Sequence, residues 1–306
     1  MGNMYDMIVV GGGPGGYTAG LYAARAGLKV AVVEKLSAGG QMALTNQVDN
    51  YPGFVDGIDG FELAQNMETQ AQRFGVESIL AEVEDLELEG DVKKLITSEG
   101  NMEARTLVLA TGANPRKLGL PGEDALVGRG VNYCAACDGM RYRGKTVVVV
   151  GGGNSAAADA MVLSRIAEKV IVVHRRDTLR ATKVYHDPLM QAENVEFLWN
   201  SAVKELLYDN KLTGLRIENL LTGHVQDIPC DGLFVSIGRA PATALVEGKL
   251  ALENGYIVAD ESTRASVPGV FAVGDVRTKQ VRQIVTAVAD GAVAAHYAEE
   301  YLAKVL

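Results

Sequence analysis

The stretch YDMIVVGGGPGGYTAG, residues 5–20, decides the fold. A short apolar run, Tyr5–Val10, leads directly into six residues of which five are glycines. The alanine-rich segment at residues 17–26 has the composition of an amphipathic helix, and a second apolar run at residues 29–33 ends at Glu34. This order predicts a strand, a tight glycine turn, a helix and a second strand.

Three glycines of this turn have separate physical roles in a dinucleotide-binding unit. Gly11 allows the tight turn, Gly13 lets the backbone approach a pyrophosphate, and Gly16 permits close packing of the helix on the strand. The helix N-terminus then directs unpaired amide groups at the phosphates. Glu34 follows at the position where a carboxylate accepts a hydrogen bond from a ribose hydroxyl, so the sequence predicts a nucleotide site.

The same pattern occurs a second time in the chain. The apolar run KTVVVV at residues 145–150 precedes GGGNSA at 151–156, and a small-residue segment at 157–167 leads to a further apolar run at 169–173. Alanine at the third position of the fingerprint still allows close packing. We therefore predict a second nucleotide-binding unit of the same kind.

The two units differ at one informative position. In the first unit Glu34 lies 23 residues after the first glycine, and in the second unit His174 has this place. Arg175, Arg176 and Arg180 follow His174. Guanidinium groups form charge-assisted, fork-shaped hydrogen bonds with phosphate oxygens, so the second unit is predicted to bind the 2′-phosphate of NADPH. The alternative is a solvated basic turn after an edge strand.

The order of these units predicts that one domain is inserted into the other. A strand that ends in a glycine turn, residues 106–113, precedes the second unit, and a similar strand at 231–239 follows it. Residues 76–97 have a β-rich, acidic pattern, residues 269–275 form a strand that ends in an acid, and a final helix covers about 283–304.

We predict an α/β fold with two Rossmann-like, three-layer nucleotide-binding domains. The first domain consists of residues 1–116 and 243–306, and residues 117–242 form the inserted domain. Two chain crossings between domains predict a hinge.

Composition excludes several classes of protein. Of the 306 residues, 48% are hydrophobic and 22% are charged, as in ordinary globular proteins. The net charge of −9 argues against a nucleic-acid-binding surface. No apolar run is long enough to span a bilayer, the first residues lack the features of a signal peptide, and the few cysteines do not form a secreted disulfide framework. We therefore expect a cytoplasmic protein.

Two of the three cysteines, Cys134 and Cys137, are two residues apart and are followed by Asp138. A zinc site would need two more ligands, and only Cys230 and four scattered histidines remain, so no metal is expected. A purely structural disulfide that closes so short a loop gives little entropic benefit. A redox dithiol fits best, because one thiolate attacks a disulfide and its neighbour resolves the product. Cys230 is expected to be a packed core residue.

The ordered set of motifs resembles low-molecular-weight, bacterial-type thioredoxin reductases of the pyridine nucleotide-disulfide oxidoreductase family over essentially the whole chain. The matching motifs are GGGPGG (11–16), GGQ (39–41), ATG (110–112), CAACDG (134–139), GGGNSA (151–156), HRRDTLRA (174–181), GVFAVGD (269–275) and VRQIVTAVADG (281–291). The resemblance implies an FAD domain in two sequence pieces, an inserted NADPH domain that carries the redox pair, and a homodimer.

The resemblance also implies site residues. The FAD contacts would be Gly11, Gly13, Gly16, Glu34, Gly40, Gln41, Asn50, Gly112, Asp275, Arg282 and Gln283. The NADPH contacts would be Gly151, Gly153, Ser155, His174, Arg175, Arg176 and Arg180.

The implied reaction passes electrons from NADPH through FAD to the Cys134–Cys137 disulfide, and then to oxidised thioredoxin or a thioredoxin-like protein. Cys137 would lie nearest the flavin, and Cys134 would attack the external disulfide. Asp138 would move the proton, although an acid before a glycine is also common in turns.

The chain departs from the family pattern at four positions. Ala136 replaces a threonine, Asn154 replaces an aspartate, and Met140 and Arg141 replace two phenylalanines that help to dock thioredoxin. The last two changes leave the identity of the partner open.

Alternative functions remain. They are a flavin dithiol oxidoreductase linked to ferredoxin or oxygen, a reductase of another disulfide-carrying protein, and a non-enzymatic flavin-bound redox sensor or assembly subunit. The second glycine fingerprint argues against the first alternative, and the intact CAACDG motif argues against the last.

Overall fold

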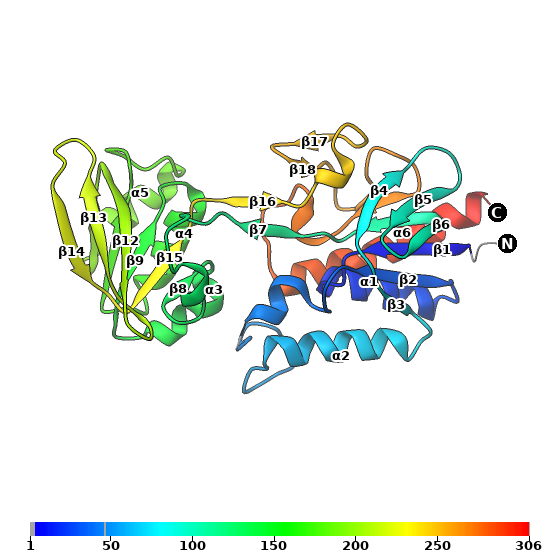
Figure 1. Ribbon diagram of the computed structural model, residues 1–306, viewed down its shortest axis with the longest axis horizontal. Coiled ribbons are helices and arrows are strands. Elements are labelled where there is room, and N and C mark those ends of the chain that lie inside the picture. The colour runs from blue at the N-terminus through cyan, green and yellow to red at the C-terminus, as the bar shows by residue number, and fades with distance from the viewer. Residues whose placement is uncertain (1–3, 46, 306) are drawn as a thin grey trace. The chain divides into compact units, whose positions relative to one another are not determined.

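The computed structural model describes residues 4–45 and 47–305. The chain divides into two compact units (Figure 1). The first unit contains the described residues up to Asn114 and those from Ala240 onwards, and the second unit is Pro115–Arg239. The crossings lie in β7 (Ala113–Pro115) and β16 (Arg239–Pro241), close to the boundaries expected at residues 116/117 and 242/243.

The first unit is built on a mixed sheet of seven strands in the order β3-β2-β1-β6-β5-β4, with β19 paired to β6. The strands are β1 (Tyr5–Val10), β2 (Val30–Glu34), β3 (Glu77–Leu80), β4 (Val83–Glu87), β5 (Lys93–Thr97), β6 (Gly100–Leu109) and β19 (Val270–Ala272). Strands β1, β2, β3, β6 and β19 pair in parallel, whereas β4 and β5 form an antiparallel extension. Most residues of β1, β2 and β19 are apolar and buried, as in strands that are covered on both faces.

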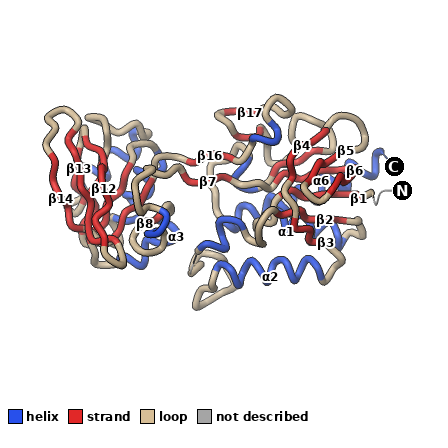
Figure 2. The backbone as a smooth tube through the Cα atoms, in the orientation of Figure 1, coloured by secondary structure: helices blue, strands red, loops and turns tan. Residues whose placement is uncertain are grey.

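Both faces of β1 are buried, since alternate residues of this strand enter different cores. Met7 and Val9 pack with the helices α1 (Pro14–Arg25), α2 (Gly60–Gln72) and α6 (Ile284–Val305). Ile8 and Val10 pack on the other face. The helices appear in blue in Figure 2.

The second unit has a parallel sheet in the order β11-β10-β9-β15-β8 and a separate antiparallel sheet in the order β12-β13-β14. The parallel strands are β8 (Val131–Asn132), β9 (Thr146–Val150), β10 (Lys169–Val173), β11 (Val195–Leu198) and β15 (Gly232–Val235). The antiparallel strands are β12 (Ser201–Tyr208), β13 (Leu212–Asn219) and β14 (Val225–Pro229).

These elements form three layers, which agrees with the predicted fold class. Val147 and Val149 of β9 pack with α4 (Asn154–Leu163), while Val148 and Val150 pack against apolar side chains of β12 and β13. The third layer is therefore a sheet of β-strands, which the sequence analysis did not predict. The predicted α/β class with two Rossmann-like units is confirmed.

The remaining elements are short. They are α3 (Ala135–Asp138), α5 (His186–Gln191), β17 (Leu252–Glu253), β18 (Tyr256–Ile257) and the 3₁₀ helices at Gly40–Leu44, Asp124–Leu126, Gly139–Tyr142, Lys183–Tyr185, Ala244–Val246 and Gly274–Val276. Among the described residues, no helix is both long and apolar enough to cross a lipid bilayer.

Two helices begin earlier than the sequence suggested. The predicted helices at residues 17–26 and 157–167 are observed at Pro14–Arg25 and Asn154–Leu163. Each starts directly after a glycine in extended conformation, Gly13 or Gly153. Proline is well suited to the first turn of a helix, because its fixed φ matches the helix and its missing N–H has no partner there.

A buried charge cluster joins the end of β19 to α6. Asp290 of α6 accepts two hydrogen bonds from the Arg277 guanidinium at 2.8 and 2.9 Å, and one from Lys279 Nζ at 2.7 Å. It also accepts from the backbone N–H of Gly274 at 2.8 Å. Burial raises the pKa of Asp290, but these cationic and amide donors outweigh it and hold the pKa below its ordinary value.

This cluster predicts a specific stability loss. Asp290→Ala leaves two cations unpaired in a buried site and should lower the free energy of unfolding by about 3–5 kcal/mol. Because the folded-state pKa is depressed, the stability that Asp290 contributes is present above its unfolded-state pKa and declines as pH falls through the folded-state value. Urea unfolding at a series of pH values measures both effects.

The matched control is Glu300→Ala, which removes an exposed acid of the same helix that pairs with Arg264 and Lys304 at the surface. It should change stability little. Equal losses in the two variants would contradict the assignment of a buried network to Asp290.

Candidate functional site

The first glycine turn has no room for side chains at two of its predicted positions. Gly11 has φ +106°, and a Cβ there would lie 2.5 Å from the carbonyl oxygen of Ala110. A Cβ on Gly16 would lie 2.0 Å from the carbonyl oxygen of Gly11. A Cβ on Gly13, in contrast, meets no atom within 4 Å, so the backbone of that residue is open to approach.

Several predicted FAD contacts lie at one edge of the sheet in the first unit. Gly11 follows β1, Glu34 ends β2, Gly112 follows β6, and Asp275 follows β19. These strands are parallel, so their carboxyl ends meet at the same edge, where open α/β sheets bind ligands. Glu34 Oε2 accepts from the backbone N–H of Gly12 at 2.7 Å, which fixes the carboxylate beside the glycine turn.

Residues from distant parts of the sequence complete this group. Asn50 Nδ2 donates to Gln283 Oε1 at 3.2 Å. Exposed Gln41 donates to Asn114 Oδ1 at 3.1 Å, and Gly40 precedes it with φ +53°. The Arg282 guanidinium lies 4.2 Å from the centre of the Tyr256 ring.

Arg282 also carries an unused donor. Its Nε is buried and has no hydrogen-bond partner within residues 4–45 and 47–305. Buried donors are normally satisfied, so this nitrogen fits a site that a ligand acceptor completes. The open backbone at Gly13 and this donor both fit a large anionic nucleotide such as FAD.

The second glycine turn repeats the geometry of the first. Gly151 has φ +145°, and a Cβ there would lie 2.4 Å from the carbonyl oxygen of Ser236. Gly153 is open, with no atom within 4 Å of a Cβ, and Ser155 is exposed in the first turn of α4. The backbone N–H of Arg180 donates to the carbonyl oxygen of Gly152 at 2.6 Å, which brings the arginine segment to the turn.

His174 is buried against this turn, whereas the arginines are exposed. A Cβ on Gly152 would lie 2.3 Å from His174 Cε1, so only glycine fits beneath the ring. Burial and the positive charges of Arg175, Arg176 and Arg180 lower the pKa of His174, which keeps the ring neutral near pH 7. Its Nε2 has no partner among the described residues.

The arginine cluster itself is free to bind an anion. Arg175, Arg176 and Arg180 are all exposed, and none forms an ion pair with another residue that the structure describes. Unpaired guanidinium groups beside a glycine turn fit a phosphate on the ribose of a bound dinucleotide.

The redox motif lies in the same unit. Cys134 precedes α3 and forms a disulfide with Cys137, with the two Cα atoms 5.3 Å apart. The backbone N–H groups of Cys137 and Asp138 donate to the carbonyl oxygen of Cys134 at 3.3 and 3.0 Å. The sulfur pair is therefore held at the first turn of a short helix.

Asp138 follows the disulfide directly and is partly buried. Burial raises its pKa, and Arg141, whose Nη1 lies 3.6 Å from Asp138 Oδ1, offsets this only in part. Met140 and Arg141, two of the four residues at which the chain departs from the expected pattern, are both exposed.

Sequence reasoning missed one residue that touches the motif. Asp159 of α4 accepts a hydrogen bond from the backbone N–H of Ala135 at 3.2 Å. A lone acid in an alanine-rich helix carries no motif that would mark it, because its partner lies 24 residues away.

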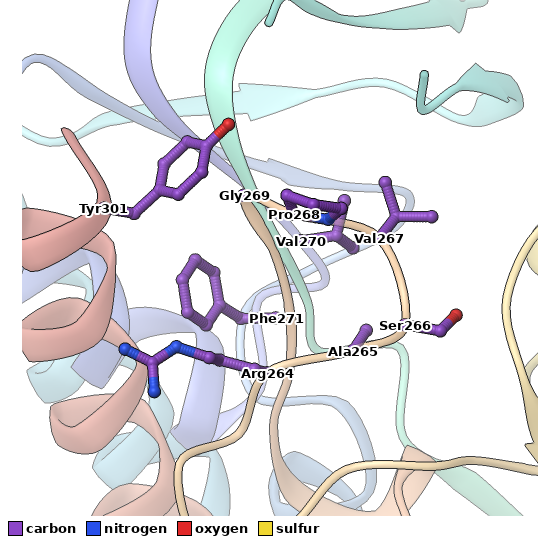
Figure 3. A pocket seen from close by; sticks show the side chains of 9 residues that line it. All are labelled: Arg264, Ala265, Ser266, Val267, Pro268, Gly269, Val270, Phe271 and Tyr301. Carbon is purple, nitrogen blue, oxygen red and sulfur yellow. The ribbon is translucent and has the colours of Figure 1, made fainter. Parts of the chain in front are cut away.

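A pocket of about 280 Å³ in the first unit lies away from this site. Residues 264–271 and Tyr301 line it (Figure 3). It is at the amino end of β19, whereas Asp275 follows the carboxyl end. Its charged residue, Arg264, is engaged by Glu300 at 2.7 Å. Among the described residues, no group of three or more His, Cys, Asp or Glu side chains is arranged to hold a metal.

Comparison with known proteins gives consistent matches over the full chain. The family described as pyridine nucleotide-disulphide oxidoreductase matches residues 5–291. A thioredoxin reductase of Streptomyces coelicolor is 45% identical over 99% of this chain and 95% of that protein. One of Treponema pallidum is 42% identical over 97% of each chain. The crystal structure of thioredoxin reductase from Streptococcus pyogenes has a TM-score of 0.91 and 44% identity, and covers 99% of this chain and all of that one.

The third cysteine behaves differently from the redox pair. Cys230 is buried in the core, as expected, and burial raises the pKa of its thiol to about 12. Because the thiolate is the reactive form, Cys230 should resist thiol reagents in the folded protein.

Thiol counting checks this expectation. After reduction with dithiothreitol and removal of the reductant, an aromatic disulfide reagent at pH 8 should modify two thiols rapidly and the third only after unfolding in guanidinium. Rapid modification of all three thiols in the folded protein would be incompatible with a buried Cys230. The variant Cys230→Ala should leave the rapid count at two.

Proposed function

We propose, from the premise that the chain belongs to the pyridine nucleotide-disulphide oxidoreductase family, that it is an NADPH-dependent thioredoxin-disulfide reductase with FAD as its second cofactor. The observation that carries the proposal is the combination found in the second unit. A disulfide between Cys134 and Cys137 shares that unit with a glycine turn flanked by three exposed arginines, which form no ion pair within the described part of the chain. Relatives named thioredoxin reductase, similar over nearly their full length, support it.

FAD is assigned to the first unit. Gly11 and Gly13 would let the backbone approach the pyrophosphate, and Gly16 would let α1 pack closely on the strand. Glu34 would accept a hydrogen bond from a ribose hydroxyl. The remaining predicted contacts gather around the same sheet edge or on the segments before α6; they are Gly40, Gln41, Asn50, Gly112, Asp275, Arg282 and Gln283. Bound FAD would supply a two-electron carrier between the nicotinamide and the disulfide.

NADPH is assigned to the second unit. Gly151 and Gly153 would leave the backbone open to the pyrophosphate, and Ser155 lies in the first turn of α4, whose amide groups attract anions. The guanidinium groups of Arg175, Arg176 and Arg180 would bind the 2′-phosphate. The neutral ring of His174 would pack against Gly152 and stabilise the glycine turn.

The cysteines and Asp138 perform the disulfide chemistry. Reduction of the Cys134–Cys137 bond to one thiol and one thiolate takes up two electrons and one proton. Asp138 would provide one proton to the departing sulfur, since its raised pKa lets it hold a proton more readily than an ordinary aspartate. The Cys134 thiolate would then attack one sulfur of the partner's disulfide, and the partner's other sulfur would leave and take a proton from solvent. Cys137 would attack Cys134 Sγ in this mixed disulfide and re-form the Cys134–Cys137 bond, as the bound partner sulfur leaves with the Cys137 proton.

The partner is proposed to be thioredoxin or a thioredoxin-like protein, and the enzyme is proposed to act as a cytoplasmic homodimer. A second candidate function is reduction of another disulfide-carrying protein. Exposed Met140 and Arg141 favour it, because a flexible thioether and a guanidinium replace an aromatic docking pair.

Nucleotide preference tests the arginine assignment. The FAD-loaded protein, mixed anaerobically with NADPH or NADH, should lose its flavin absorbance with NADPH at far lower concentration. Arg175→Ala/Arg176→Ala should raise the KM for NADPH about ten- to hundredfold per lost contact, since a hydrogen bond to a charged group contributes about 1.5–3 kcal/mol, and should barely change the KM for NADH.

The matched control is Arg129→Ala/Arg165→Ala, which removes two exposed arginines of the same unit from other loops. It should leave both KM values unchanged. Equal use of the two nucleotides by the wild type would refute the 2′-phosphate assignment.

Serine variants of the redox pair test the disulfide assignment. Cys134→Ser and Cys137→Ser should each abolish reduction of thioredoxin and leave bleaching of the flavin by NADPH largely intact. Cys230→Ser should retain activity, because this thiol is buried away from solvent. Thioredoxin reduction is followed by turbidity of insulin, and wild-type rates in either of the first two variants would exclude the pair as the redox centre.

A further inference from the structure

One carboxylate connects the redox motif to the second glycine turn. Asp159 lies in α4, which begins directly after Gly153. Its Oδ1 accepts from the backbone N–H of Ala135 at 3.2 Å, and its Oδ2 accepts from the hydroxyl of Ser236. Ser236 follows β15, and its carbonyl oxygen is the atom that excludes a side chain from Gly151.

The bond to Ala135 satisfies a donor that the helix leaves unpaired. Ala135 is the first residue of α3, and the first N–H groups of a helix have no partner within it. Ala135 is almost fully buried, so losing this partner would leave a buried donor unsatisfied. Burial raises the pKa of Asp159, and the bonds from Ser236 and Ala135 and the charge of Arg239 act against that rise.

The carboxylate also lies close to the reactive sulfur. Four covalent bonds separate the nitrogen of Ala135 from Cys134 Sγ, so Asp159 Oδ1 is at most about 8 Å from that sulfur. A disulfide carries no charge, whereas reduction creates a thiolate in the pair. The Ala135 N–H and the Ser236 hydroxyl donate to the two oxygens of Asp159, which favours its ionised form. An ionised carboxylate and a thiolate at this separation repel each other, most strongly where water is partly excluded.

We infer that Asp159 is a positioning residue for the Cys134–Cys137 pair, which holds the first turn of α3 in place and favours the oxidised form. This deepens the proposed function and rests on it only in taking the pair to be redox-active. Asp138, the other carboxyl of the motif, has a different place, since it pairs with Arg141 rather than with the backbone of α3.

Two substitutions distinguish the effect of the Asp159 charge from the effect of its hydrogen bonds. Asp159→Asn keeps the shape, because the amide oxygen accepts from Ala135 and the amide nitrogen donates to Ser236 Oγ. Asp159→Ala removes both contacts. The control, Asn194→Ala, removes two hydrogen bonds at the other end of the same helix, where Asn194 Nδ2 donates to the carbonyl oxygens of Ser164 and Ala167 at 2.9 and 3.1 Å.

The redox equilibrium is measured on the full-length protein in buffers of reduced and oxidised dithiothreitol at pH 7, without NADPH or thioredoxin. Reduced dithiothreitol gives two electrons and one proton to the Cys134–Cys137 bond, which leaves one thiol and one thiolate, releases its other proton to the buffer and becomes a cyclic disulfide. The cysteines are then alkylated and counted by mass spectrometry. Asp159→Asn should raise the equilibrium constant for reduction about tenfold, or about 30 mV in midpoint potential. Asn194→Ala should leave it unchanged.

The order of the first turn of α3 is measured by amide hydrogen exchange of the peptide that contains residues 134–138. In Asp159→Ala these amides should exchange about tenfold faster than in the wild type, and in Asp159→Asn they should exchange at the wild-type rate. A wild-type redox equilibrium in Asp159→Asn, or wild-type exchange in Asp159→Ala, would overturn the inference. Failure of the proposed function would instead appear as absence of NADPH-driven reduction in a wild type whose dithiothreitol equilibrium is normal.

Discussion

Both halves of this protein depend on the close approach of backbone to backbone at a strand–helix turn. At Gly16 a single added carbon would lie 2.0 Å from the carbonyl oxygen of Gly11, and at Gly151 it would lie 2.4 Å from that of Ser236. Both distances are far inside van der Waals contact. Because these positions lack side chains, α1 and α4 can start immediately after their strands, and their N-terminal amides are directed at the carboxyl edge of each sheet.

The sequence was most informative where this constraint acts. The paired glycine turns, the strands that flank them and the last helix, expected at about 283–304 and observed at Ile284–Val305, all follow from local pattern. Helix starts were placed too late, because glycine-rich segments were taken to be turns throughout. The β12–β14 layer escaped prediction, since β-bulges interrupt the alternation of β12 and many of the apolar side chains that it packs against belong to strands distant in the sequence.

The candidate site was predictable to the extent that its residues belong to contiguous motifs. Contacts between distant segments were not predictable, because no local spacing records them. Asn50 meets Gln283 across 233 positions, and Asp159 reaches the redox motif across 24. The buried Asp290 cluster, which ties Gly274 to α6, is of the same kind. Such carboxylates become recognisable only when the fold brings their donors together.

In the second unit, the arginines of the second glycine turn are exposed, whereas the carboxyls near the disulfide are partly buried. The arginine cluster forms no ion pair with any residue that the structure describes, although the net charge of the chain is −9 and acids are abundant enough to neutralise it. Three cations in one turn repel each other, and a fourth on His174 would add to that repulsion. The lowered pKa of His174 prevents this, and the neutral ring can then pack beneath Gly152.

The carboxyls beside the disulfide, Asp138 and Asp159, are instead partly buried, where gain or loss of a proton on the carboxyl has a larger electrostatic effect on the neighbouring sulfur. Exposure thus suits the arginines to a mobile anionic ligand, and burial suits the aspartates to a fixed redox group.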